Sequence, residues 1–386
     1  MKPPLLIVSP LFPPMRGGLA DHTDLLARTL AAENAVAVLT TVGAETQRDF
    51  AVRASVEDWR DARAVLAALN LAPPEGEILW QYVPHMYGRG GVNPALPRVV
   101  QSLRLRGRNQ LLLAHEIAAP FSLWPQRFWY ALAHRWQWHQ LLPPAHFVGF
   151  STEAWLDEWS ARRPAHREMF GLVPSPSNMP RVPVPEGHAE RWRLAHGLQA
   201  GTKIIAHFCT LSAAKQMPWV LQAWRQCHLA GAPVALVLIG GGEAVEVSVE
   251  LKPWLKPLGH LPSVEVSAAL QAADVLALPF VDGVSERRAS FMAGLQHGCA
   301  VATTIGHNTG RSLGGAGFFA AAPADQPDQF AAQVSRLLAD AGERRRLSLS
   351  GMAAYESRYG WPRVEEILAA RLRRVRGERP RAACSS

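Results

Sequence analysis

The sequence predicts two doubly wound α/β domains that face a cleft. The chain has 386 residues, of which 48% are hydrophobic, and this is more than one ordinary core requires. Short apolar runs alternate with longer helix-compatible segments along the whole chain, which is typical of parallel sheets with crossover helices. A proline-rich stretch at residues 173–180 can continue neither a helix nor a central strand, so we expect it to link the two domains.

The apolar runs form two series, one on each side of this linker. The first series is 5–8, 36–39, 78–80, 111–114 and 147–150, and the second is 203–208, 234–239, 275–278, 300–303 and 317–320. Residues 361–376 predict a final helix, because Pro362 suits its first turn and its apolar residues share one face. We expect an N-terminal domain over 1–180, a C-terminal domain over 181–358, and a helix with a basic tail over 359–386 that packs back on the N-terminal domain.

Composition excludes several classes of protein. The four cysteines are scattered without a C-x-x-C pair, so neither a disulfide framework nor a structural zinc site is expected. The N-terminus lacks an apolar leader, and no run reaches the roughly 18–20 apolar residues of a membrane span. The formal charge of +8 suits anionic partners, but no nucleic-acid-binding module accompanies it. We therefore expect a cytoplasmic protein, soluble or peripheral, that binds no nucleic acid.

In the first series, candidate binding residues follow two of the predicted strands. Gly17 and Gly18 open a helix whose free N–H groups and positive dipole would attract an anion. An ordinary strand-to-helix turn is the alternative interpretation. His115 and Glu116 follow a buried run, at the carboxyl end of a parallel strand, where open α/β sheets bind ligands. This position favours a functional role over that of a purely structural histidine.

In the second series, positive charges follow two of the predicted strands. Lys215 comes after the first strand, where it would neutralise a diphosphate unless it is simply a solvated loop residue. Arg287, Arg288 and Ser290 lie at the start of the helix that follows the third strand. Two guanidinium groups and free helix N–H groups match a diphosphate, whereas a pair of exposed surface charges is the alternative.

Motifs that the chain lacks narrow the chemistry further. The sequence contains no G-x-x-x-x-G-K-[ST] and no clean G-x-G-x-x-G pattern, which disfavours P-loop kinases and simple dehydrogenases. It also has no D-x-D pair that would hold a metal-bound nucleotide. We therefore expect neither a metal nor a cofactor.

Taken in order, these segments resemble the retaining GT-B glycosyltransferases of the large glycogen-synthase-like family 4, over nearly the whole chain. The Gly17-Gly18 turn with Asp21 and His22 looks like the family's acceptor-side glycine loop. His115 looks like its histidine after an N-domain strand, and Lys215 matches the lysine of its donor-phosphate motif. Further matches are Ser177–Pro180, Gly259–Pro262, Ala273–Val275 and Gly298.

The chain departs from the family at its paired glutamates. Counted from Gly298, the two family positions fall on Ser285 and Ala293, so both carboxylates are missing. Glu286 stands one place away and is expected to substitute in part. The loss of this pair bears on which donor is bound and on how its ribose is contacted, more than on the fold.

The resemblance implies transfer of a sugar from a UDP or GDP donor to a hydroxyl of a glycan or lipid-linked acceptor, with retention, in exopolysaccharide assembly. The implied catalytic residues are His115, Lys215 and Arg288. The expected donor contacts are Gly17, Gly18, Thr210, Lys215, Ser285, Glu286, Arg287, Arg288 and Ser290. On the acceptor side we expect Asp21, His22 and Glu116. Thr210 stands where the family has an arginine, whose charge Arg287 and Arg288 are expected to replace.

Two other functions stay open at this point. A lapsed transferase would bind a sugar nucleotide or act as a scaffold for polysaccharide assembly, and the missing glutamates support it. A sugar-nucleotide epimerase would share the fold, but it uses carboxylates that have no place in this sequence.

The segment at residues 124–142 interleaves tryptophan and phenylalanine with arginine and histidine. Aromatic and cationic side chains on one helix are typical of a membrane-interface segment, whereas tryptophans that pack in the domain core are the alternative. The segment follows His115-Glu116 and so borders the acceptor side, which favours an anionic membrane surface at the inner face of the cytoplasmic membrane as a partner. The arginines at 371–381 are expected to add about 1 kcal/mol of attraction each near such a surface.

Overall fold

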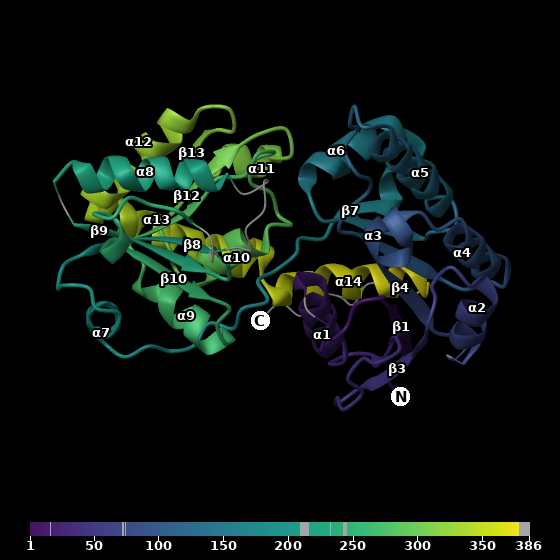
Figure 1. The fold of residues 1–386 in the computed structure, drawn as a ribbon. Coiled ribbons are helices and arrows are strands. Elements are labelled where there is room, and N and C mark those ends of the chain that lie inside the picture. Colours follow the sequence, from purple (N-terminus) through teal and green to yellow (C-terminus); the bar gives the residue numbers. More distant parts are fainter. Residues whose placement is uncertain are drawn as a thin grey trace, which may run out of the picture. The chain divides into compact units, whose positions relative to one another are not determined.

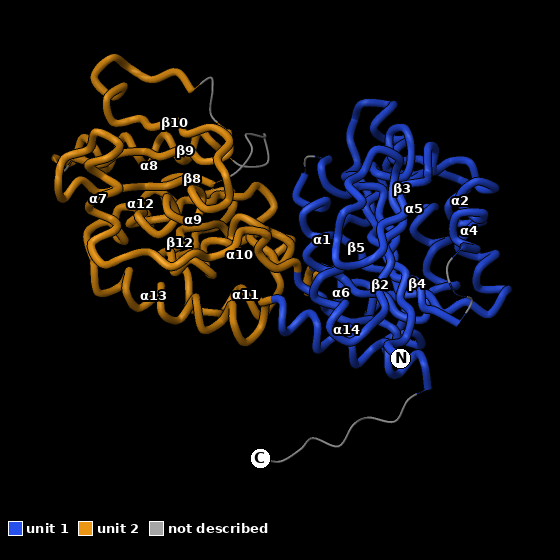
Figure 2. Tube along the Cα trace, turned by 90° about the horizontal axis from the view of Figure 1, so that it is seen from below, with its two compact units in different colours: residues 1–151, 155–174, 361–386 blue, residues 152–154, 175–360 orange. Residues whose placement is uncertain are grey.

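The computed structural model describes residues 1–15, 17–71, 73, 75–208, 216–231, 233–241 and 245–377. The chain forms two compact units, shown in blue and orange in Figure 2. Unit 1 comprises residues 1–151, 155–174 and 361–386, and unit 2 comprises 152–154 and 175–360. No helix among the described residues is both long and apolar enough to cross a membrane.

Unit 1 is built on a sheet in which seven parallel strands are described, in the order β3-β2-β1-β4-β5-β6-β7 (Figure 1). Its strands are β1 Pro4–Val8, β2 Ala35–Thr41, β3 Ala51–Val56, β4 Glu77–Tyr82, β5 Gln110–Ala114, β6 Phe147–Phe150 and β7 Phe170–Leu172. The order reverses between β1 and β4, where Leu6 pairs with Ile78. Such a reversal is the topological switch point of an open α/β sheet.

Helices cover both faces of this sheet. They are α1 Gly18–Leu30, α2 Ala62–Asn70, α3 Pro84–Tyr87, α4 Ala95–Leu105, α5 Pro125–Leu141, α6 Glu153–Arg162 and α14 Trp361–Val375, with 3-10 turns at Arg89–Gly91 and Pro164–Met169. Alternate residues of β1 point to opposite faces, so Leu5 and Ile7 pack with residues of α1 and α14. Leu6 and Val8 pack on the other face, in a cluster with residues of α2, α4, α5 and α6.

The C-terminal helix α14 lies beside α1 in unit 1 (Figure 1). It buries Val364, Leu368 and Leu372 in the same cluster as Leu26 and Leu30 of α1. At its end, Arg376 forms an ion pair with the buried Glu77 at 2.7 Å and donates a hydrogen bond to the side chain of Asn34. A charge-assisted pair of this kind holds the final helix against the sheet.

The chain passes into unit 2 after Pro174, before the boundary at 180 that the sequence analysis expected. The reason is local hydrogen bonding, since the backbone N–H of Ser175 donates to the carbonyl of Glu286 at 3.0 Å. Residues 152–154 also belong to unit 2. There the carboxylate of Glu153 accepts bonds from the backbone N–H and the hydroxyl of Ser312, both at 2.7 Å.

Unit 2 repeats the architecture, with six described parallel strands in the order β10-β9-β8-β11-β12-β13. The strands are β8 Lys203–Phe208, β9 Val234–Ile239, β10 Leu255–Gly259, β11 Val275–Leu278, β12 Val301–Ile305 and β13 Ala320–Pro323. The helices are α7 His188–Ala195, α8 Met217–Leu229, α9 Ser263–Ala272, α10 Ala289–Gln296, α11 Arg311–Gly314, α12 Pro327–Ala339 and α13 Ala341–Ala354, with a 3-10 turn at Lys252–Trp254 and a π-helix at Tyr355–Tyr359. The order reverses between β8 and β11.

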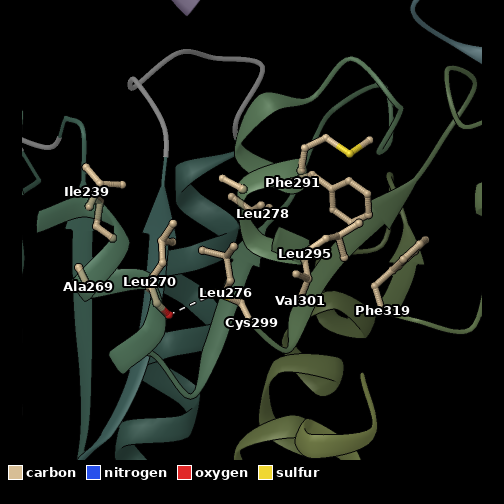
Figure 3. Close-up of a cluster of buried hydrophobic side chains, with 14 of the residues drawn as sticks. Ile239, Ala269, Leu270, Leu276, Leu278, Phe291, Leu295, Cys299, Val301 and Phe319 are labelled. Carbon is tan, nitrogen blue, oxygen red and sulfur yellow. Dashed lines mark hydrogen bonds between the residues drawn. The ribbon is translucent and has the colours of Figure 1, made fainter. Parts of the chain in front are cut away.

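The core of unit 2 fixes β11 and α10, which flank the loop at residues 279–288. Leu276 and Leu278 of β11 pack with Phe291 and Leu295 of α10 and with Val301 of β12, as Figure 3 shows. In the same view, the Cys299 thiol donates to the carbonyl of Leu270 at 3.3 Å. The loop between β11 and α10 therefore starts and ends on closely packed elements.

One predicted strand is placed wrongly in the sequence analysis, and three strands are missed. The strand expected at 317–320 spans Ala320–Pro323, because Gly317 adopts a left-handed turn with φ +68° and the two following phenylalanines pack in the core. The missed strands β3, β7 and β10 each have a described neighbour on one side only. They are short or contain partly exposed and polar residues, so the sequence carries no continuous apolar run at these positions.

Candidate functional site

The loop at residues 279–288 lies at the switch point of unit 2. It follows β11, which pairs with β8 through Val275 and Ile205 at the place where the strand order reverses. Ligands of open α/β sheets bind beyond the carboxyl ends of the strands at such a point. The loop after β8 carries Thr210 and Lys215, and both predicted donor residues lie outside the described residues.

Hydrogen bonds to β12 and the residues after it hold this loop in place. The backbone N–H of Phe280 donates to the Thr304 hydroxyl at 2.8 Å, and that of Val284 donates to the Thr304 carbonyl at 2.8 Å. Gly283 has φ +85°, and a Cβ atom there would lie 2.2 Å from the backbone nitrogen of Gly306. Only glycine fits this turn, since both the conformation and the space exclude a side chain.

Two arginines of the loop share a single carboxylate. Arg287 forms an ion pair with Oδ2 of Asp282 at 3.2 Å, and the Asn308 amide donates to the same oxygen at 2.8 Å. Arg288 contacts Oδ1, the other oxygen of this carboxylate. The Arg288 guanidinium also lies over the ring of Phe280, 4.6 Å from its centroid. The side chains of Arg287 and Arg288 are only 18% and 13% exposed, so their interpretation as exposed surface charges is wrong.

The formal charges of the loop balance, because Asp282 and Glu286 supply two carboxylates and Arg287 and Arg288 supply two guanidinium groups. Burial raises the pKa of Asp282, but Arg288, Asn308 and Arg287 outweigh it and hold that pKa below its ordinary value. The Asp282 carboxylate is therefore ionised. The guanidinium of Arg288 belongs to the N-cap residue of α10, and no side-chain hydrogen bond of this residue caps the helix. A helix start of this kind favours an anion.

Two serine hydroxyls belong to the same region. Ser285 is fully buried and Ser290 is 8% exposed. Within the described part of the chain, neither hydroxyl oxygen has a hydrogen-bond partner. Buried hydroxyl groups are normally paired, so these two are candidates to bond a ligand. Both were predicted as donor contacts from the sequence.

Glu286 supports the backbone around the loop. The residue is fully buried, one oxygen of its carboxylate accepts the backbone N–H of Glu153 at 3.2 Å, and its carbonyl accepts that of Ser175. These bonds join three backbone segments of unit 2. The prediction that Glu286 contacts the donor stays a prediction. Ala293, at the second lost glutamate position, is fully buried in the core of α10.

In unit 1, three polar side chains meet at the β1/β4 switch point. His22 comes from α1 after β1, Gln81 lies on β4, and His115 follows β5. The two imidazole rings lie edge to face with their centroids 4.8 Å apart. The ring of Trp361 at the start of α14 packs on His22, with centroids 5.1 Å apart. The structure thus brings together two histidines that stand far apart in the sequence.

Gln81 joins the two rings and sets their tautomers. Its Oε1 accepts a hydrogen bond from Nε2–H of His115, and its Nε2–H donates toward Nδ1 of His22 at 3.5 Å. This pattern places the proton of His115 on Nε2 and the lone pair on Nδ1. The sequence analysis missed Gln81 and Trp361. A signal for Gln81 existed, because a glutamine inside the otherwise apolar run of β4 is a buried polar group that needs partners.

The other predicted residues of unit 1 lie near the start of α1 and after β5. Gly17 is the N-cap residue of α1 with φ +147°, a conformation that favours glycine, and Gly18 begins the helix. Asp21 is exposed in the first turn. Glu116 is half-buried, and its backbone N–H donates to the carbonyl of Tyr82 at 3.3 Å. No group of three or more histidine, cysteine, aspartate or glutamate residues that could hold a metal ion occurs among the described residues.

Comparisons with known proteins agree with this arrangement. The family model for glycosyl transferases group 1 matches residues 202–340, which lie within unit 2. No curated protein matches the chain.

Solved structures are similar over almost the whole chain. Sucrose-phosphate synthase from Thermosynechococcus elongatus has a TM-score of 0.71 at 16% identity, covering 97% of this chain and 99% of that one. WaaG, a glycosyltransferase involved in lipopolysaccharide biosynthesis, has a TM-score of 0.69 at 13% identity, covering 95% and 99%. HepE from Anabaena, in complex with UDP and glucose, has a TM-score of 0.68 at 13% identity, covering 95% and 98%.

The strand orders and these similarities define the GT-B fold, with two Rossmann-like domains. Residues 202–340 match the glycosyl transferases group 1 family, so this part of unit 2 is similar to glycosyltransferases, and the whole chain has the GT-B fold. The fold class and the family resemblance that the sequence predicted are confirmed.

The buried His22 generates a pH dependence of folding. Burial, and then the nearby His115, hold the pKa of His22 well below its ordinary value of 6.5, so the folded chain keeps this ring neutral while the unfolded chain protonates it. The stability from this residue is complete above pH 6.5 and is lost as the pH falls toward the folded-state pKa. We expect His22→Gln to reduce the slope of stability against pH in this window by up to about 1.4 kcal/mol per pH unit.

Urea unfolding of both proteins at several pH values below 6.5 measures this difference. The exposed His166, replaced by glutamine, is the matched control and should leave the slope unchanged. Identical slopes for His22→Gln and the wild type would show that the ring is protonated in the folded chain.

Proposed function

We propose that the chain transfers a sugar from a nucleoside-diphosphate donor, UDP- or GDP-linked, to a hydroxyl of a glycan or lipid-linked acceptor, with retention. The observation that carries the proposal is the loop at 279–290, which combines two mostly buried arginines, two buried serine hydroxyls and an uncapped helix start at the switch point of unit 2. The similarity to HepE, whose structure holds UDP and glucose, supports a nucleotide sugar as the donor. The similarity to WaaG supports a role in surface polysaccharide or glycolipid assembly.

The loop is proposed to act on the leaving diphosphate. Arg287 and Arg288 donate charge-assisted hydrogen bonds to phosphate oxygens, while Ser285, Ser290 and the N–H groups of α10 complete the cradle. Cationic groups held in place before the reaction stabilise the negative charge that develops as the sugar leaves. Lys215 and Thr210, which lie outside the described residues, are proposed to contact the same group on the resemblance alone.

The histidine pair of unit 1 is proposed to serve the sugar and acceptor side. His115 contacts the transferred sugar or moves a proton, with Asp21 and Glu116 near the acceptor and Gly17 and Gly18 in contact with the donor. Gln81 positions the ring of His115 through its hydrogen bond to Nε2. Because His22 is buried and neutral, we assign it a positioning role behind Gln81 instead of direct contact with the acceptor.

Donor turnover without a metal is the direct test of the proposal. With two guanidinium groups in place of a divalent ion, we expect release of nucleoside diphosphate from UDP- or GDP-sugars at the same rate with and without EDTA. A thermal-shift screen of nucleoside diphosphates first identifies which nucleotide base the chain binds. A ligand at 100 times its Kd stabilises the folded chain by about 2.7 kcal/mol, which raises the melting temperature. Activity that EDTA abolishes and magnesium or manganese restores would show that the proposed metal-free mechanism is wrong.

The arginine pair should determine the affinity for the diphosphate. We expect Arg287→Ala and Arg288→Ala each to weaken binding of the selected nucleoside diphosphate roughly ten- to hundredfold, because a hydrogen bond to a charged group contributes about 1.5–3 kcal/mol. Calorimetric titration measures the change. Arg345→Ala, on an exposed position of α13, is the matched control and should bind as the wild type does. Unchanged affinity in both loop variants would remove this loop from the donor site.

His115 should affect turnover more than binding. We expect His115→Ala to lower kcat by about a hundredfold or more while the Kd of the nucleoside diphosphate stays the same, since its contact strengthens only as the sugar is transferred. His166→Ala, which removes an exposed histidine of the same unit, controls for the loss of an imidazole. Equal losses of binding and turnover would give His115 a structural role instead.

A lapsed transferase remains the second candidate, because serine and a core alanine occupy the positions of the family's two glutamates. It predicts that the chain binds a nucleoside diphosphate but releases none from any donor. The donor-turnover and thermal-shift experiments together separate the two functions. No feature of the described structure favours an epimerase.

A further inference from the structure

One helix of unit 1 exposes a continuous apolar surface. We call it the α5 apolar face, and it consists of Phe121, Leu123, Trp124, Phe128, Trp129, Leu132 and Trp136. The exposed fractions of these side chains run from 36% for Leu132 to 102% for Leu123, with Trp124 at 72% and Trp129 at 67%. Positions 124, 128, 132 and 136 are four residues apart and therefore lie on the same side of the helix.

The opposite side of α5 already supplies the contacts that hold the helix. Ala131, His134, Trp138 and Leu141 are buried there, and Trp138 packs edge to face against Phe150 and Trp159. The interpretation of the segment as ordinary core is therefore correct for Trp138 and wrong for Trp124, Trp129 and Trp136. The exposed tryptophans are not members of the buried core cluster to which Trp138 belongs.

An exposed apolar surface of this kind on a water-soluble chain usually marks a binding surface. Its charge pattern narrows the partner, because residues 117–152 contain no aspartate or glutamate. Arg127 lies exposed in the first turn of α5. Arg135 lies over the ring of Phe121, 3.9 Å from its centroid. Arg135 also donates to the carbonyls of Ala119 and Ala131, so Arg127 is the exposed arginine of this segment. The segment thus combines aromatic rings with an exposed cation and contributes no carboxylate of its own.

We propose that the α5 apolar face docks on an anionic lipid bilayer. Tryptophan and phenylalanine rings insert at the level of the headgroups, and the Arg127 side chain reaches lipid phosphates while its stem stays apolar. A second copy of this chain is a poorer occupant, because each face would present its own Arg127 and residues 117–152 supply no carboxylate to pair with it. The inference does not depend on the transfer reaction, since docking needs neither donor nor acceptor.

The basic C-terminal segment is left out of this surface, contrary to the expectation from the sequence. Arg376 pairs with Glu77, Arg374 with Glu168, Arg373 with Glu33, and Arg371 donates to the carbonyl of Glu168. These arginines are engaged inside unit 1 and are not available as a free cationic patch. Arg379 and Arg381 lie outside the described residues.

Flotation of the full chain with vesicles tests the proposal. Vesicles of phosphatidylcholine alone are compared with phosphatidylcholine that contains rising fractions of phosphatidylglycerol, at low and high salt and without donor. We expect the wild type to float only with anionic vesicles and less at high salt. The double variant Trp124→Ala/Trp129→Ala should lose about tenfold or more in partition coefficient, because it removes two large apolar groups from the interface. Arg127→Glu should weaken binding to anionic vesicles alone.

The matched control is Leu194→Ala/Leu229→Ala, which removes two exposed apolar side chains from unit 2 and should float as the wild type does. Circular dichroism and thermal unfolding verify that every variant folds. The proposal is overturned if the wild type stays unbound at every composition, if it floats equally on neutral vesicles, or if the tryptophan variant floats normally. Sedimentation that shows a wild-type dimer and a monomeric tryptophan variant would also overturn it, in favour of self-association.

Discussion

Both units depend on one constraint, which is that a parallel sheet must be covered by helices on both faces. Leu5 and Ile7 of β1 pack under α1 and α14, while Leu6 and Val8 pack under the helices of the opposite face. A sheet covered in this way leaves only its edges and strand ends open to ligands. Where the strand order reverses, the loops on neighbouring strands diverge and leave room for polar groups. The arginine loop of unit 2 and the histidine pair of unit 1 both lie at such points.

The loop at 279–288 illustrates how charged side chains can be held near a buried core. Asp282 is ionised, and it orients both Arg287 and Arg288. Thr304 and Gly283 fix the backbone that carries these groups. The carboxylate of Glu286 supports the backbone of Glu153.

Much of the fold was predictable because buried parallel strands are continuous apolar runs. The runs at 203–208, 234–239 and 275–278 coincide with β8, β9 and β11, residue for residue. The strands β3, β7 and β10 escaped prediction, since a strand paired on one side only can be short and partly polar. At the site, Arg287, Arg288 and His115 were found by their place after a strand. Gln81 was not, because its partners His22 and His115 follow other strands and lie far from it in the sequence.

The sequence by itself determined the GT-B class, the positions of the central strands and the segments that carry charge at their carboxyl ends. These features follow from local hydrophobic runs and from the order of motifs along the chain. Only the tertiary structure decided which side chains meet. It placed His22 beside His115, brought the Glu286 carboxylate to the backbone of Glu153, and separated the buried Trp138 from the exposed Trp124 and Trp129. Burial and pairing depend on which elements pack together, and neighbouring residues of one helix can face the core or the solvent.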